Sequence, residues 1–218
     1  MDAVAAVPAR ASAPAPSGGG PALGLKYSIL RRDGAEMVEV APDTVFHAGD
    51  RIQFNVQTNC PGYLYIVSQG SSGTWKPMFP SPEVENGDNH VDGWRSYTMP
   101  PGARILFDEQ TGAEKVFLVF SREPEPDLEA LIYSLQAKPQ PAAAPSEQPA
   151  PKQLLVASNL NIGDATVGRL RSAYARDLVI EKVDPSTAGE RKEYAVYVVN
   201  PSGSADSRVV ADLRLEHK

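Results

Sequence analysis

Hydrophobic and polar residues alternate along the middle of the chain. In Arg51–Thr58 the apolar Ile52, Phe54 and Val56 alternate with polar neighbours, which predicts a strand with one buried and one exposed face, as in an antiparallel sheet. Two further runs, G-Y-L-Y-I-V-S at 62–68 and E-K-V-F-L-V-F-S at 114–121, consist almost entirely of β-branched, aliphatic and aromatic residues. Such runs are typical of central strands buried on both faces.

Weaker strand patterns flank these segments and are separated by turn residues such as Asp33-Gly34 and Ala48-Gly49-Asp50. In the first half of the chain, strands are predicted at Lys26–Arg31, Met37–Val40, Thr74–Phe79, Trp94–Thr98 and Arg104–Asp108. Near the C-terminus, strands are predicted at Asp177–Val183, Glu193–Val199 and Arg208–Glu216.

One segment has a helical period. Leu128, Leu131, Ile132 and Leu135 fall at i, i+3, i+4 and i+7, which gives one apolar stripe. We expect this stripe to pack on the sheets, and docking on another protein is the alternative. The pattern as a whole predicts an all-β fold, an immunoglobulin-like antiparallel β-sandwich with one short peripheral helix.

Two segments rich in alanine and proline divide the chain. Residues 1–24 hold few large apolar side chains and cannot offset their ordering entropy, so we expect a disordered tether. Residues 137–153 contain five prolines and are predicted to be an extended linker, with docking in an aromatic groove as the alternative. Residues 25–136 are then the main part of the sandwich with the helix, and residues 154–218 are strands that complete it.

Charge and cysteine content narrow the function. The net charge of −6 argues against a nucleic-acid partner, because phosphate binding needs a basic face. The single cysteine, Cys60, excludes an intrachain disulfide and a multi-cysteine zinc site. No stretch approaches the roughly 18 apolar residues of a transmembrane helix. The N-terminus lacks the pattern of a signal peptide, so the protein is either cytoplasmic or lacks its export signal here.

Candidate catalytic residues are scattered. His47, His90 and His217 form no H-x-H or H-E-x-x-H pattern. Cys60 lies in a Cys-Pro-Gly turn without a known nucleophile signature. We therefore predict no catalytic residue, no metal site and no cofactor, and we expect that the protein is not an enzyme.

Two loops remain as weaker candidates. The 82–93 loop concentrates acidic and amide side chains that could bind calcium, but it lacks the order of an EF-hand loop, which favours a solvated acidic loop. These side chains are Glu83, Glu85, Asn86, Asp88, Asn89 and Asp92. The run G-S-S-G at 70–73 lacks the lysine and helix of a phosphate-binding loop and predicts a hairpin turn.

Aromatic residues in the 70–98 region form the best candidate binding site. Trp75, Phe79, Trp94 and Tyr97 lie in or beside loops, and exposed aromatic side chains on loops often contact protein or carbohydrate partners. The alternative is that they close one end of the core.

Several short motifs follow one another in a recognisable order. They are F-x-x-G-D-R-I from Phe46, with Gly49 and Asp50; P-G-Y-L-Y from Pro61, with Gly62, Tyr63 and Tyr65; Phe79-Pro80; N-x-V from Asn89; Pro100; and G-x-E ending at Glu114. This order resembles a bacterial family of domains of unknown function over about residues 26–124. Members of that family are often attached to caspase-like or kinase-like regions or exported to the cell envelope. The resemblance implies a β-sandwich and no established activity.

The motif residues also suggest structural roles. Gly49 and Asp50 suit a tight turn in which the Asp50 carboxylate accepts backbone hydrogen bonds. Gly62 is expected to adopt a backbone conformation that other residues resist. Tyr63 and Tyr65 should share one face of their strand.

We therefore expect an envelope-associated, periplasmic or secreted module that binds a protein or an envelope polymer. An auxiliary sensory domain acting with a separate signalling protein is the first alternative. A hydrolase on a β scaffold is the second.

Overall fold

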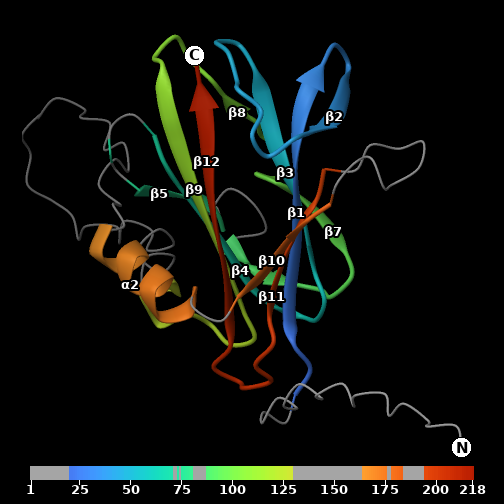
Figure 1. Ribbon diagram of the computed structural model, residues 1–218, viewed down its shortest axis with the longest axis vertical. Coiled ribbons are helices and arrows are strands. Elements are labelled where there is room, and N and C mark those ends of the chain that lie inside the picture. Colours follow the sequence, from blue (N-terminus) through green and yellow to red (C-terminus); the bar gives the residue numbers. More distant parts are fainter. Residues whose placement is uncertain are drawn as a thin grey trace, which may run out of the picture.

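Two antiparallel β-sheets pack face to face in this computed structural model (Figure 1). It describes residues 20–70, 73, 75–80, 87–129, 164–175, 178–183 and 194–218. The predicted immunoglobulin-like fold is confirmed as an all-β sandwich of two facing antiparallel sheets. Among the described residues, no helix is long and apolar enough to cross a membrane.

The larger sheet, sheet A, has the strand order β10-β11-β1-β3-β7, with β2 beside β1 and β8 beside β3. Its strands come from both halves of the chain, because β11 pairs antiparallel with β1. The bounds are β1 Leu23–Asp33, β2 Glu36–Val40, β3 Arg51–Thr58, β7 Ser96–Met99, β8 Ile105–Leu106, β10 Val179–Lys182 and β11 Val196–Asn200.

The smaller sheet, sheet B, has the order β12-β9-β4-β5, with β6 beside β4. The C-terminal strand β12 pairs with β9 from Arg208 opposite Ser121 to His217 opposite Gly112. The bounds are β4 Gly62–Gln69, β5 Trp75–Phe79, β6 His90–Val91, β9 Gly112–Ser121 and β12 Arg208–His217.

The main core lies between the sheets. Alternating residues of β1, β3, β11 and β12 fill it, among them the fully buried Ile52 and Phe54 of β3. The period-two pattern of the sequence therefore identified the inward face of these strands.

A second apolar layer covers the outer face of sheet B. The helix α2 (Asp164–Tyr174) lies against this face (Figure 1), and its Val167 and Leu170 pack with Phe117 and Val119 of β9. Covered on both faces, β4 and β9 are the central strands that their continuous apolar runs predicted.

The sequence analysis missed α2 and predicted only strands after residue 153. Its apolar pattern is weak, because Val167 and Leu170 are its described buried apolar residues and Gly168, a poor helix former, lies between them. Packing on sheet B stabilises a segment whose own pattern does not identify it as a helix.

Residues 126–129 are helical, which agrees with the start of the predicted helix; its continuation lies outside the described residues. Leu128 is buried in the second layer, as expected for a stripe that packs on the sheets. The 137–153 linker and residues 1–19 also lie outside the described residues. One boundary needs correction: Leu23 and Gly24, assigned to the tether, belong to β1, and Leu23 is fully buried.

Gly62 owes its role to close packing rather than to an unusual backbone conformation. A Cβ atom at this position would lie 2.4 Å from the carbonyl oxygen of Ser121 and 2.7 Å from the Phe120 ring. Gly62 does not have a positive φ. Among the motif glycines, it is Gly49 that has one (φ 91°). Contact between β4 and β9 thus leaves no space for a side chain.

We expect Gly62→Ala to lower the free energy of unfolding by about 2 kcal/mol or more, because the added methyl group overpacks this contact. Urea unfolding measures the change. Gly112→Ala is the matched control: Gly112 also lies in sheet B, but its Cβ would meet no atom within 4 Å, so it should alter stability by less than about 1 kcal/mol. Equal effects of both substitutions would contradict the steric explanation.

Candidate functional site

The four aromatic candidates separate into core and surface residues. Trp75 and Phe79 are 2% and 6% exposed. Trp75 packs in the second apolar layer and Phe79 in the main core. Their prediction as binding residues is wrong, and the alternative, that they fill the core, holds because β5 directs both rings into apolar layers. Trp94, in contrast, is 74% exposed.

Trp94 is held in the solvent by its backbone. Its φ is 65°, in the left-handed region that non-glycine residues rarely adopt. Its N–H donates to the Thr58 carbonyl oxygen at 2.7 Å, and its carbonyl oxygen accepts from Gln57 Nε2 at 2.9 Å. Such a conformation costs about 1–3 kcal/mol and persists only where surrounding contacts fix it. The indole is therefore presented by a defined turn.

The neighbouring Gly93 allows the Trp94 turn to pack closely against the backbone at Cys60. A Cβ atom on Gly93 would lie 2.8 Å from Cα of Cys60, so the turn is in close contact with the turn that precedes β4. Thr58 Oγ1 donates to the Cys60 carbonyl oxygen at 2.9 Å and joins the same contact. Close packing thus fixes the position of Trp94 relative to the end of β3.

Tyr97 supports this turn. Its hydroxyl oxygen accepts a hydrogen bond from the Asp92 backbone N–H at 2.8 Å. The Arg95 guanidinium lies over its ring, 5.1 Å from the centroid. Tyr97 is partly buried against the core, so it positions the Trp94 turn and contributes little exposed surface of its own.

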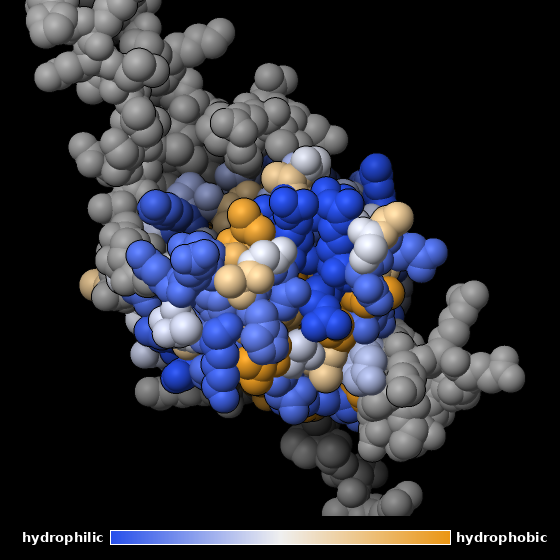
Figure 2. Space-filling model, turned by 90° about the horizontal axis from the view of Figure 1, so that it is seen from above, coloured by the Kyte–Doolittle hydropathy of each residue, from blue (hydrophilic) through white to orange (hydrophobic). Residues whose placement is uncertain are grey.

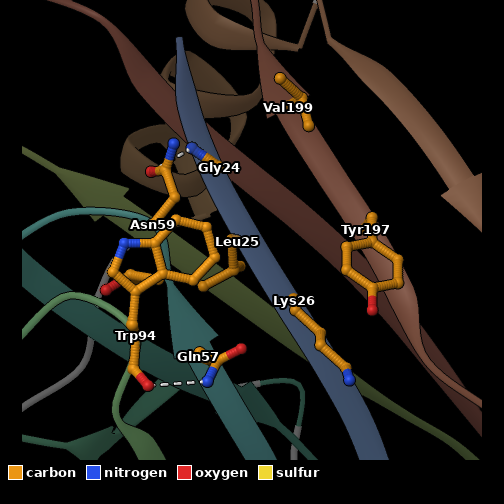
Figure 3. Close-up of a pocket in the computed structure, with 9 residues that line it drawn as sticks. Gly24, Leu25, Lys26, Gln57, Asn59, Trp94, Tyr197 and Val199 are labelled. Carbon is orange, nitrogen blue, oxygen red and sulfur yellow. Dashed lines mark hydrogen bonds between the residues drawn. The ribbon is translucent and has the colours of Figure 1, made fainter. Parts of the chain in front are cut away.

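Beside Trp94, the outer face of sheet A forms a groove of about 210 Å³, which we call the Trp94 groove. Figure 3 shows Trp94 and Asn59 on one side of β1 and Tyr197 and Val199 of β11 on the other. Register explains this arrangement, because Gly24 lies opposite Val199 and Lys26 opposite Tyr197. The lining residues are Gly24, Leu25, Lys26, Gln57, Thr58, Asn59, Trp94, Tyr197 and Val199.

The groove exposes mainly apolar atoms. Both ends of the Asn59 amide are engaged, since Oδ1 accepts from Gly24 N–H and Nδ2 donates to the Ala22 carbonyl oxygen, each at 2.8 Å. Lys26 Nζ lies over the Tyr197 ring at 5.4 Å. None of the described residues that line the groove is His, Cys, Asp or Glu. The arrangement therefore suits contact with an apolar group between aromatic rings.

Sequence reasoning missed Gly24, Lys26, Tyr197 and Val199. Alternation in β11 indicates that Tyr197 and Val199 share the face opposite to Val196 and Val198. Their position beside Trp94 depends on strand order and could not be read from the sequence.

The histidines and the cysteine lie in separate structural settings. His90 packs edge-on against Tyr63, and His217 is buried beside Phe107. The N–H of His47 donates to the Asp50 carboxylate at 2.9 Å. Within the described segments, no group of three His, Cys, Asp or Glu side chains could hold a metal ion.

Cys60 is half-buried, and burial raises the pKa of its thiol, an effect that nearby Arg122 partly opposes. A raised pKa keeps the thiol protonated and weakens it as a nucleophile.

The two loop candidates are only partly described. Residues 81–86, with Glu83, Glu85 and Asn86, lie outside the described residues. The Asp88 carboxylate accepts from the His90 N–H, and Asp92 forms an exposed ion pair with Arg95. In the 70–73 run, Gly73 N–H donates to the Gly70 carbonyl oxygen at 3.0 Å, as expected for a turn.

The remaining motif residues have structural roles. Phe46 is fully buried and stacks on Phe107 at 4.8 Å. Asp50 accepts the backbone hydrogen bond that the turn predicted. Tyr63 and Tyr65 share the outer face of β4, also as predicted. Pro80 is buried directly after the end of β5.

Tyr65 connects sheet B to the 125–129 segment. Its hydroxyl oxygen accepts from Glu125 N–H at 2.9 Å, and its O–H donates to Glu129. Burial is the main cause that raises the pKa of Tyr65.

A second buried contact is the ion pair of Glu125 with Arg208 at 3.2 Å. These contacts hold the chain that follows β9 against β12.

At the end of the sandwich that carries the C-terminus, the described residues visible in Figure 2 form no broad apolar surface. Hydrophilic residues cover most of it, and hydrophobic ones form only small separate areas (Figure 2). The Trp94 groove is thus the better candidate for contact with a partner.

Residues 45–124 match a family described as a domain of unknown function, DUF4384. The match agrees with the bacterial type of domain that the motifs indicated. No curated protein and no solved structure matches the chain. The Trp94 groove contains residues from inside and outside the matched segment. Trp94 and the β3 residues belong to residues 45–124, whereas Gly24, Lys26, Tyr197 and Val199 do not.

Glu114, the last motif residue, is partly buried in β9. Burial raises the pKa of its carboxyl group; His217 lowers this pKa and Asp108 raises it. Since the folded-state pKa lies above the unfolded one, ionisation of Glu114 favours the unfolded chain. This cost is absent at low pH and develops as the pH rises through the folded-state pKa.

We expect Glu114→Gln to gain stability relative to the wild type as the pH rises from about 4 to 7, because the amide cannot ionise. Thermal unfolding of both proteins at several pH values measures this difference in melting temperature. A difference that stays constant or shrinks with rising pH would contradict the effect of burial on this carboxyl group.

Proposed function

We propose that the protein is a non-enzymatic, extracytoplasmic or envelope-associated module that binds a protein or an envelope polymer through the Trp94 groove. The observation that carries this proposal is the presentation of Trp94: a large indole, 74% exposed, on a backbone of φ 65° beside an apolar groove. Exposure of the indole to water does not stabilise the fold, whereas a tryptophan buried against a partner is a typical interface hot spot.

The chemistry of the lining favours binding over catalysis. Its aromatic rings and apolar atoms supply contact area, and none of the described lining residues is His, Cys, Asp or Glu. The raised pKa of Cys60 gives no support to the hydrolase alternative.

The partner class follows from charge and shape. The net charge of −6 disfavours nucleic acid. A protein segment or a polymer with apolar ring faces can stack between Trp94 and Tyr197. The extracytoplasmic location rests on the resemblance to a family with exported members, and the auxiliary sensory role is an alternative that the same groove could serve.

We expect Trp94→Ala to lose capture of its partner from an envelope extract of the source cells, because an aromatic hot spot contributes about 2 kcal/mol or more, roughly thirtyfold in affinity. Capture on the immobilised full chain, with quantification of bound material, measures the effect. Leu106→Ala is the matched control, since Leu106 is also exposed (54%) but pairs at the opposite end of β3.

Undiminished capture by Trp94→Ala would refute the groove as the binding site. A partner found only in the cytoplasmic fraction would refute the location. Circular dichroism of each variant checks that the fold is unchanged.

A further inference from the structure

Among the described residues, the hydrogen-bonding groups on the outer edge of β12 have partners only at the two ends of the strand. At one end the Phe46 N–H donates to the Glu216 carbonyl oxygen, and at the other Asn200 Nδ2 donates to the Arg208 carbonyl oxygen. Backbone groups alternate in direction along a strand, so those of Val210, Asp212 and Arg214 point to the same side. Within the described residues, the backbone N–H and C=O groups of these three residues have no hydrogen-bond partner on the side away from β9. They form a free edge.

Sheet A extends past this edge by one strand. β11 packs on β12, and β10 is the next strand outward and the last of its sheet. Ile180 of β10 lies opposite Val198 and therefore points to the core side. It is nevertheless 60% exposed, because no described strand of sheet B lies beneath it.

A cleft of about 360 Å³, which we call the β12 cleft, occupies this position. Ile180 and Lys182 lie on the β10 side, and Ala211 and Leu213 lie on the β12 side. Val196 and Val198 of β11 complete its apolar part. The cleft is the place where a further strand of sheet B would lie.

We propose that an extended segment of a partner protein adds to the edge of β12 in this cleft and becomes an additional strand of sheet B beneath β10. The free groups of Val210, Asp212 and Arg214 alternate with the spacing of an extended backbone, so a polypeptide strand satisfies them. This site is distinct from the Trp94 groove, which lies on the other face of sheet A, and does not depend on the function proposed for that groove.

Because β10 extends beyond β12, the cleft has room for a single inserted segment but not for a second copy of this chain. If the β12 strands of two copies paired edge to edge, the second copy's sheet A would have to extend into the space that β10 already fills. A partner segment brings no such sheet.

The surroundings define the side chains of the segment. Positions facing inward meet Ile180, Val198 and Leu213, so apolar side chains fit there, and Lys182 and Asp43 also line the cleft. Positions facing outward lie beside Asp212, which Arg171 binds with two hydrogen bonds, and beside Arg214, which pairs with Glu216 at 2.6 Å. These charged neighbours favour polar side chains on the outward positions. The segment therefore alternates apolar and polar residues.

The free edge is tested first by amide hydrogen exchange of the full chain, followed by NMR. The N–H groups of Val210, Asp212 and Arg214 should exchange at least tenfold faster than those of Ala211 and Leu213, which point toward β9. Equal protection along the strand would mean that the edge is already occupied, and would overturn the proposal.

The segment is tested by selecting random twelve-residue peptides on the immobilised full chain. We expect enrichment of sequences that alternate apolar and polar residues. The best selected peptide should slow exchange of the three edge amides at least tenfold. Ile180→Asp should weaken its binding at least tenfold.

Val179→Asp is the matched control, because Val179 is the adjacent residue of β10 and is 56% exposed, but lies on the outer face opposite Val199. It should change affinity by less than about twofold. The proposal is overturned if no peptide is enriched, if the selected peptides bind Ile180→Asp as well as the wild type, or if they protect other amides. Sedimentation of the free chain as a dimer that Ile180→Asp dissociates would assign the cleft to a second copy and overturn it as well.

Discussion

The pairing of β12 with β9 is the interaction on which the rest of the structure depends. It runs from Arg208 to His217 and completes the face of sheet B that packs on sheet A. At its start, the buried Arg208 forms an ion pair with Glu125. Loss of either partner would leave a buried charge without compensation, at a cost of about 3–5 kcal/mol. The pair thus ties the chain that follows β9 to the last strand.

Both candidate sites depend on this C-terminal part. Tyr197 and Val199 of β11 form one side of the Trp94 groove, and β10 with β12 forms the β12 cleft. The 45–124 segment that matches the family supplies Trp94 and most of sheet B, but it forms only part of the Trp94 groove and includes none of the residues that line the β12 cleft. The strands outside the match therefore complete the surfaces that could give this chain its particular partners.

The edge strand β10 contributes neighbouring side chains to two different surfaces. Val179 points to the outer face of sheet A and Ile180 to the cleft. Both are exposed, although large apolar residues at a sheet edge favour unwanted association. Glu181 and Lys182 follow them directly, and such charges limit this association.

Alternation predicted most strands, because a half-buried strand places every second side chain in the core. It worked well for β3 and β12, and the continuous runs of β4 and β9 correctly indicated burial on both faces. It failed for α2, whose helical state depends on packing against sheet B. The sequence also grouped Trp75 and Phe79 with Trp94, since composition does not distinguish a ring that enters the core from one that leaves it.

The sequence alone thus determined the antiparallel strands, the turn at Gly49-Asp50 and the shared face of Tyr63 and Tyr65, because local periodicity and turn chemistry control these features. Tertiary structure decided the rest. It made Gly62 a contact point between β4 and β9, placed Tyr197 beside Trp94 and left β10 without a strand beneath it among the described residues. These relations join residues far apart in the chain, and only the order and register of the strands bring such residues together.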